Sequence, residues 1–127
     1  MPLASGLLSG RYDESTTFGP DDHRTYNRHG EAFDIGETFS GVDYGVGLAA
    51  VRRLSALRPD GLSMAAFALR WILDQDGVSV VIPGARSPEQ VRGNVAASAA
   101  APLSPDTVEG VRAVYDELVA PLVGDRW

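Results

Sequence analysis

The chain has 127 residues with a formal net charge of −6 at pH 7, and 44% of its residues are hydrophobic. This length and composition allow one domain at most and exclude a disordered tail, a membrane helix and, because the charge balance is acidic, a general nucleic-acid partner. The sequence has no cysteine, and all 11 basic residues are arginine, which excludes disulfide scaffolds, cysteine metal sites and reactions that need a lysine of this chain.

The first 41 residues show no regular period. Residues 2–11 hold a proline, two glycines and three leucines, so we expect a packed loop there. Residues 12–41 carry five aromatic side chains among polar residues and glycines. An irregular stretch of this length is typically functional, and its aromatic content predicts a lid-like loop that packs on another surface.

Apolar residues at helical spacing predict four helices in the rest of the chain. Ser63, Ser87 and Ser104 each stand where an N-cap residue would begin a helix. Trp71 falls at helical spacing in the second helix and is predicted to be a core residue. The expected helices cover residues 42–57, 64–74, 87–99 and 104–118.

Residues 78–82, Val-Ser-Val-Val-Ile, are predicted to form the only strand. The segment is nearly all β-branched and barely alternates, which is typical of a strand buried on both faces in a parallel sheet. The chain supplies no neighbouring strand, and buried backbone groups left without a partner cost about 1–3 kcal/mol each. The chain is therefore expected to be part of a larger fold or to assemble with other chains.

The richest chemical signal lies at the end of this strand, in residues 82–94. A strand enters a loop and then a capped helix, whose N-terminus offers free amide donors and partial positive charge. Arg86 stands beside it with a planar group suited to phosphate, and Gln90 and Asn94 share one helix face because they are four residues apart. This arrangement is compatible with a phosphate site, although spacing alone does not favour it over the alternative. The alternative is a solvated Arg86, a Gln90 that only caps the helix and an ordinary surface Asn94.

Other candidate sites have simpler explanations. Gly6 and Gly10 would let the backbone approach a ligand, or would form a tight packed turn. His23 and His29 are six residues apart, which matches no standard metal-ligand spacing and favours exposed loop histidines. A tyrosine acid needs a positioned partner such as lysine or histidine, and no serine has the sequence context of a nucleophile elbow. We therefore expect neither a catalytic residue nor a metal site.

Three segments carry a resemblance to a known family. Residues 2–12, Pro-Leu-Ala-Ser-Gly-Leu-Leu-Ser-Gly-Arg-Tyr, resemble the loop after the seventh barrel strand of aldo-keto reductases. Residues 82–94, which begin Ile-Pro-Gly-Ala-Arg-Ser-Pro-Glu-Gln, resemble their eighth strand and following helix, and residues 68–73 their seventh helix. Residues 26–42 resemble a lid of one bacterial branch. The resemblance implies an α/β fold, the C-terminal part of a (β/α)8 TIM barrel that is mostly helical with one strand at 78–82.

The same resemblance implies an NADPH-dependent enzyme, in which hydride passes from nicotinamide to an aldehyde or ketone and a tyrosine donates the proton. Arg11 stands where a basic residue near the phosphates is usual in the family. The backbone of the first segment would strap the pyrophosphate and the adjoining ribose, at Pro2, Leu3, Ala4 and Gly6.

The last segment would meet the other end of the cofactor. Gly84 and Arg86 would border the adenosine 2′-phosphate, so a preference for NADPH over NADH would rest mainly on Arg86. Gln90 and Asn94 would contact the adenine end. Gly93 departs from a related pattern in which an acidic residue is common.

The family's catalytic Asp, Tyr, Lys and His lie on earlier strands and have no matching position here. The chain is therefore expected to be a single partial domain, residues 1–127, that holds part of a cofactor site and is inactive alone. Its partners would be the nicotinamide cofactor and either the missing N-terminal part of the barrel or a second copy. Two alternatives stay open, a non-catalytic module that binds nicotinamide nucleotides and a protein-interaction module. No secretory leader is present, which predicts a cytoplasmic chain, and Met1 is interpreted as a start inside a longer reading frame or the product of a truncated gene.

Overall fold

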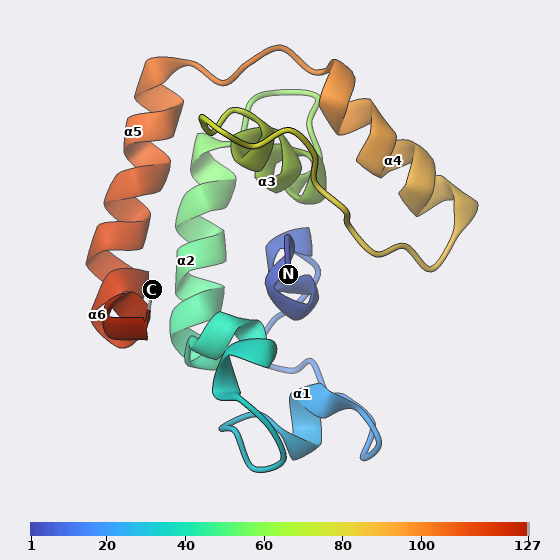
Figure 1. Cartoon of the computed structure of the whole chain (residues 1–127), viewed down its shortest axis with the longest axis vertical. Helices are drawn as coiled ribbons and strands as arrows, with labels where there is room; N and C mark the ends of the chain where they lie inside the picture. Colours follow the sequence, from blue (N-terminus) through green and yellow to red (C-terminus); the bar gives the residue numbers. More distant parts are fainter. Residues whose placement is uncertain (127) are drawn as a thin grey trace.

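Four helices of ten or more residues carry the structure. The computed structural model describes residues 1–126. In it α2 and α5 lie side by side, α3 packs against α4, and the N-terminal segment lies between α2 and α4 (Figure 1). Their bounds are α2 Tyr44–Leu57, α3 Met64–Leu73, α4 Pro88–Ala99 and α5 Pro105–Val114. None of the helices in residues 1–126 is long and apolar enough to span a bilayer.

Shorter helical pieces complete the fold. Near the C-terminus a π-helical turn, in which the Ala120 N–H donates to the Tyr115 carbonyl five residues back, separates α5 from α6. Pro121 follows directly, and proline disrupts regular α-helical bonding, which accounts for the irregular turn at this point. The short pieces are η1 Ala4–Ser9, α1 His23–Tyr26, η2 Ile35–Glu37, η3 Phe39–Gly41, η4 Tyr115–Val119, α6 Ala120–Val123 and η5 Gly124–Arg126.

The helix starts follow the predicted caps. The hydroxyl of Ser63 accepts a hydrogen bond from the Ala66 N–H at 3.1 Å. Ser87 and Ser104 do the same at the starts of α4 and α5, and each is followed by a proline in the first turn. The four predicted helices are therefore confirmed, with bounds within two residues of the prediction except at the end of the last helix, where α5 ends at Val114 and the predicted range reaches residue 118.

The predicted strand at residues 78–82 is not formed. Within residues 1–126 the structure is helical and contains no strand. Val80 is 69% exposed and Ile82 is 82% exposed, although their composition is that of a buried strand. A strand exists only through hydrogen bonds to a neighbouring strand, and none of the described residues provides one. The prediction of one clear strand is thus wrong for the chain by itself, because the segment has no neighbouring strand to pair with in the part of the chain that the structure describes.

A first hydrophobic core joins the N-terminal segment to α2. Its buried side chains are Leu7, Phe39, Leu48 and Val51. A Cβ atom on Gly47 would lie 2.6 Å from Cδ2 of Leu7, so glycine at this position allows Leu7 to pack against the helix. The packing of Leu7 therefore offsets the low helix propensity of this glycine.

A second core lies between α3 and α4. Ala66, Leu69 and Ala97 are buried there, and Leu3 and Val81 pack against them. Because two of the three buried residues are alanines, the two helix backbones can approach closely. Residues from the N-terminal segment and from the exposed 78–82 segment thus meet on the same helix pair.

Trp71 is only half-buried and lines an apolar cavity of about 390 Å³ between the N-terminal segment, α2, α3 and α5. Its Nε1 atom is buried and has no hydrogen-bond partner among the described residues. The prediction that Trp71 is a core residue is therefore right only in part.

The irregular stretch at residues 12–41 packs through aromatic rings. The Phe18 ring lies 5.2 Å from the Tyr12 ring, 6.1 Å from Phe39 and 6.3 Å from Tyr44, measured between centroids. Edge-to-face pairs of this kind add to the stabilisation from buried area. The predicted packing is confirmed for Tyr12, Phe18 and Phe39, whereas Tyr26 and Phe33 are 45% and 42% exposed.

One buried amide orders the far part of the same stretch. Asn27 is fully buried, and its Oδ1 accepts hydrogen bonds at 2.8 Å from the N–H groups of Ala32 and Phe33. Its Nδ2 donates to the hydroxyl of Thr38 at 3.3 Å. A buried polar side chain that satisfies backbone groups in this way fixes the loop around it.

Candidate functional site

The start of α4 brings four predicted site residues together. The Oε1 atom of Gln90 accepts a hydrogen bond from the Arg86 N–H at 2.6 Å. The side-chain amide of Asn94 donates to the Gly84 carbonyl at 3.3 Å. Ser87 caps the helix by accepting from the Gln90 N–H at 3.2 Å. Gln90 therefore bonds to the residue before the N-cap and does not cap the helix itself, and the loop is shaped by the residues assigned to a ligand.

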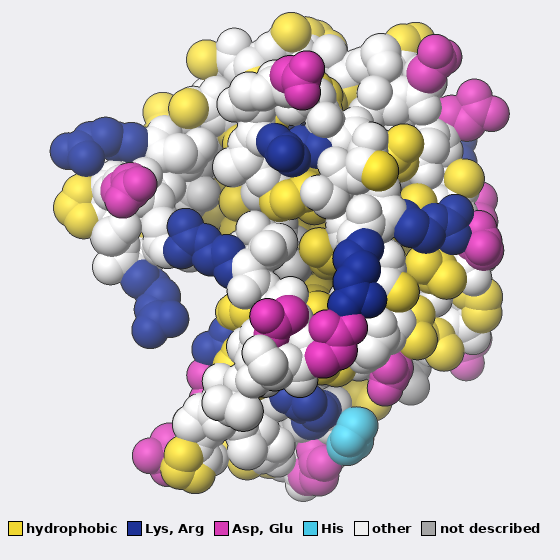
Figure 2. Space-filling model, turned by 180° about the vertical axis from the view of Figure 1, so that it is seen from behind, with side chains coloured by type: hydrophobic (Ala, Val, Ile, Leu, Met, Phe, Trp, Pro, Cys, Tyr) yellow, Lys and Arg dark blue, Asp and Glu magenta, His cyan; other side chains and the backbone are white. Residues whose placement is uncertain are grey.

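The charge around this loop suits an anion. Arg86 is exposed and belongs to none of the ion pairs found within residues 1–126. It stands next to the N-terminus of the 12-residue helix α4, where the helix dipole places partial positive charge, but Pro88 has no N–H and the Gln90 N–H is bonded to Ser87. Arginine side chains project from the side of the molecule that carries α4, beside a hollow (Figure 2). A phosphate group would therefore find a cation and the positive end of a helix at one place.

A largely apolar cavity of about 400 Å³ lies between α4 and the exposed 78–82 segment. Val81, Ala85, Val91 and Val95 are among the residues that line it, and Asn94 adds a polar amide. A cavity of this size and lining can hold a flat ring with one or two polar contacts.

The N-terminal candidates form a tight turn that rests on α3. The N–H groups of Ala4 and Gly6 donate to the carbonyls of Met1 and Leu3, at 3.1 and 2.9 Å. These two amides therefore form hydrogen bonds within the segment, as a tight packed turn predicts. Ala4 has φ of 46° and is in the left-handed region that favours glycine.

Pro2 and Leu3 begin this turn, and Leu3 packs on the core between α3 and α4. Because α3 contacts both η1 and α4, it supports both groups of predicted site residues. Arg11 is exposed and belongs to none of the ion pairs found within residues 1–126. No described contact joins it to the other candidates.

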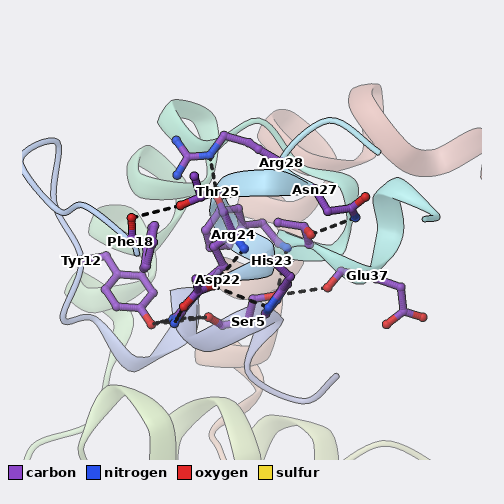
Figure 3. Close-up of polar contacts among 12 residues, drawn as sticks. Ser5, Tyr12, Phe18, Asp22, His23, Arg24, Thr25, Asn27, Arg28 and Glu37 are labelled. Atoms are coloured by element: carbon purple, nitrogen blue, oxygen red, sulfur yellow. Dashed lines mark hydrogen bonds and ion pairs between the residues drawn. The ribbon is translucent and has the colours of Figure 1, made fainter. Parts of the chain in front are cut away.

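A polar cluster that the sequence did not predict lies beside this turn (Figure 3). Arg24 donates from Nε to Oδ1 of Asp22 at 2.8 Å, and from Nη1 to the carbonyl of Ser5 at 3.3 Å. Its guanidinium lies 4.3 Å from the centre of the Phe18 ring and donates a short hydrogen bond to the hydroxyl of Tyr12. The partners of Arg24 are 2 to 19 residues away in sequence, and only the Asp at an N-cap position two residues before it was a local signal.

The two histidines differ from the prediction in one respect. His29 is exposed, as expected for a loop histidine, whereas His23 is half-buried with Nε2 3.4 Å from the hydroxyl of Ser5. Within residues 1–126 no group of three His, Asp or Glu side chains could hold a metal ion.

Asp22 makes the stability of this cluster depend on pH. The hydrogen bonds from Arg24 hold the pKa of the Asp22 carboxyl well below its ordinary value of 3.8. Stabilisation from a carboxylate with a lowered pKa is complete above the ordinary value and is lost as pH falls below it. We expect the free energy of unfolding to decrease below about pH 4, and more steeply than in an Asp22→Asn variant, which keeps the helix cap. Urea unfolding at successive pH values measures this difference.

Other carboxyl groups also have lowered pKa values, among them Asp13 through its hydrogen bonds to Ser15 and Thr16. Only the difference between the two proteins therefore isolates Asp22. If both lost stability in parallel on acidification, the ion pair with Arg24 would contribute nothing.

Comparisons with known proteins agree with the resemblance. A family model described as the aldo/keto reductase family matches residues 1–116. The chain is 36% identical over 89 residues to Aldo-keto reductase YhdN of Bacillus subtilis (strain 168). The aligned residues cover 70% of this chain and 25% of that protein. It is 35% identical over 97 residues to L-glyceraldehyde 3-phosphate reductase of Escherichia coli (strain K12), and these residues cover 76% of this chain and 26% of that protein. The chain thus spans about a quarter of the length of these relatives. No solved structure gives a significant match.

Proposed function

The chain belongs to the aldo/keto reductase family, and on that premise we propose that it is the cofactor-binding C-terminal portion of an NADPH-dependent reductase of aldehydes or ketones. The observation that carries the proposal is the loop at the start of α4. There an exposed arginine that has no carboxylate partner within residues 1–126 stands beside a helix N-terminus, and the loop is shaped by Gln90 and Asn94.

The residues at this loop fit the adenosine end of the cofactor. Arg86 would bind the 2′-phosphate, with Gly84 next to it, where a Cβ atom would meet no neighbour within 4 Å. Gln90 and Asn94 would contact the adenine. Arg86 therefore supplies the preference for NADPH over NADH, because the 2′-phosphate is what distinguishes the two cofactors.

The N-terminal turn would lie along the pyrophosphate and the adjoining ribose. The Ala4 and Gly6 amides already form hydrogen bonds within the turn. The segment would therefore hold the cofactor through the close approach of its backbone and not through these two donors. Pro2, Leu3 and the exposed Arg11 complete the proposed contacts near the phosphates.

The bound cofactor would supply the hydride, and the residues of this chain would bind and orient it. No position of the chain matches the catalytic Asp, Tyr, Lys or His of the family, and the sequence contains no lysine at all. The chain alone is therefore inactive, and the proton donor comes from the rest of the barrel. In the complete barrel residues 78–82 form a strand, because neighbouring strands then cover the side chains that are exposed here. The expected cytoplasmic location stays a prediction.

Replacing Arg86 with alanine tests the cofactor assignment. Removal of one phosphate-binding guanidinium is expected to weaken NADPH binding about tenfold, equal to about 1.4 kcal/mol, and to leave NADH nearly unchanged. Titration of the chain with each nucleotide, followed by nicotinamide fluorescence, measures both affinities.

Arg92→Ala is the matched control, because Arg92 is an exposed arginine on the same helix without an assigned contact. Equal losses for NADPH and NADH in Arg86→Ala would refute the 2′-phosphate role.

A second candidate is a non-catalytic module that senses nicotinamide nucleotide. It is favoured by the same site, since the proposed cofactor residues gather in a chain without any catalytic match. Tight NADPH binding by the chain alone, unaltered when the rest of a barrel is added, would place this candidate first.

A further inference from the structure

The N-terminal turn has a backbone shape that its own sequence does not favour. Ala4 and Ser5 have φ of 46° and 55°, in the left-handed region that residues with a Cβ atom avoid, and only Gly6, at 88°, is suited to it. Such conformations persist where the surroundings hold them, and they gather at binding sites. The turn therefore needs contacts from another part of the molecule to keep this shape.

The carbonyl and the hydroxyl of Ser5 are held by residues 12–41 (Figure 3). Its carbonyl accepts hydrogen bonds from Arg24 at 3.3 Å and from the Tyr12 hydroxyl at 3.5 Å. Its hydroxyl accepts from the Phe39 N–H at 3.1 Å and donates to the Glu37 carbonyl at 3.3 Å. These partners come from two parts of the irregular stretch, so Ser5 is fixed from both.

Arg24 is itself fixed before it reaches Ser5. Asp22 accepts from its Nε at 2.8 Å and from its Nη2 at 2.5 Å, and the Phe18 ring lies against its guanidinium. The Arg24 side chain is only 16% exposed. Tyr12, which bonds to the same guanidinium, also lies against Gly6, where a Cβ atom would be 2.5 Å from its hydroxyl. The guanidinium therefore fixes the turn relative to residues 12–41.

We propose that Arg24 is a positioning residue for the cofactor, because it locks the turn at residues 4–6 in the shape that receives the pyrophosphate. This inference rests on the proposed function, and it adds a residue that lies outside the proposed contacts. It also makes residues 12–41 a fixed support of the turn rather than a lid that must open.

Two ligands separate this role from general stability. NADPH reaches both the α4 loop and the turn, whereas adenosine 2′-monophosphate has no pyrophosphate and reaches the α4 loop alone. In Arg24→Ala the affinity for NADPH is expected to fall about tenfold, while that for adenosine 2′-monophosphate stays the same. Isothermal titration calorimetry on the whole chain measures both.

Two further variants serve as controls for the positioning role. Ser5→Ala removes only the hydroxyl contacts and should give a smaller loss that is again confined to NADPH. Arg53→Ala removes an exposed arginine paired with Glu117 and should change neither affinity. Undiminished NADPH binding in Arg24→Ala, or equal loss of both ligands in a variant that still folds by circular dichroism, would overturn the positioning role alone. Failure of the unaltered chain to bind either nucleotide would overturn the proposed function and this inference with it.

Discussion

Mixing this chain with the remaining part of a reductase barrel is expected to turn two inactive polypeptides into one that oxidises NADPH in the presence of an aldehyde. The suitable partner is the part of the Bacillus subtilis relative that lies outside the matched 89 residues. That part would bring the proton donor and the neighbouring strands, and this chain would bring the proposed cofactor contacts. The measured quantity is the aldehyde-dependent loss of NADPH absorbance for each polypeptide and for the mixture.

The exposed segment at residues 78–82 explains why association is expected. Val80 and Ile82 present apolar surface to solvent, and covering a β-branched side chain yields about 1.5–3 kcal/mol. Parallel strands on both sides would also satisfy the backbone groups of the segment, as they do in a TIM barrel. Assembly and the formation of a working site are therefore expected to occur together.

A proline placed in this segment tests the mechanism of assembly. Val80→Pro removes a backbone donor that a sheet needs, at a site that is exposed in the chain alone, and should abolish the gain of activity. Ala101→Pro adds a proline to the exposed loop between α4 and α5 and serves as the matched control. Turnover by the chain alone, or a folded complex without turnover, would contradict the proposal.

Features fixed by neighbouring residues were predictable from the sequence. The caps at Ser63, Ser87 and Ser104 depend on a hydroxyl and an N–H three residues later, so the local sequence places the helix starts. The contact of Gln90 with the Arg86 N–H is equally local. Prediction therefore succeeded along the helices, whereas the ligand role of the loop that begins α4 stays a prediction.

Features that depend on distant residues were not predictable in the same way. Residues 78–82 have strand composition, but pairing is decided by a neighbour that the described chain does not contain. The contact between Phe39 and Ser5 spans 34 residues, and that between Arg24 and Ser5 spans 19. No periodicity links such positions, so the cluster around Arg24 emerged only from the structure.

Replacing Phe39 with alanine is expected to destabilise the chain by about 3–5 kcal/mol. Phe39 is 1% exposed and lies in the core that joins the N-terminal segment to α2. Its ring contacts those of Phe18 and Tyr44, at 6.1 and 5.1 Å between centroids. Domains are typically stable by about 5–15 kcal/mol, so this loss removes a large part of the total.

Phe33→Ala is the matched control for this experiment, since Phe33 belongs to the same irregular stretch but is 42% exposed. Its replacement should cost about 1 kcal/mol or less, because little buried area is lost. Urea unfolding followed by circular dichroism measures both variants. Because the Phe39 N–H also donates to Ser5, partial unfolding around Phe39 should release the N-terminal turn and weaken NADPH binding as well. Equal destabilisation by the two variants would mean that residues 12–41 are not anchored through Phe39, and the support that they give to the turn would need another source.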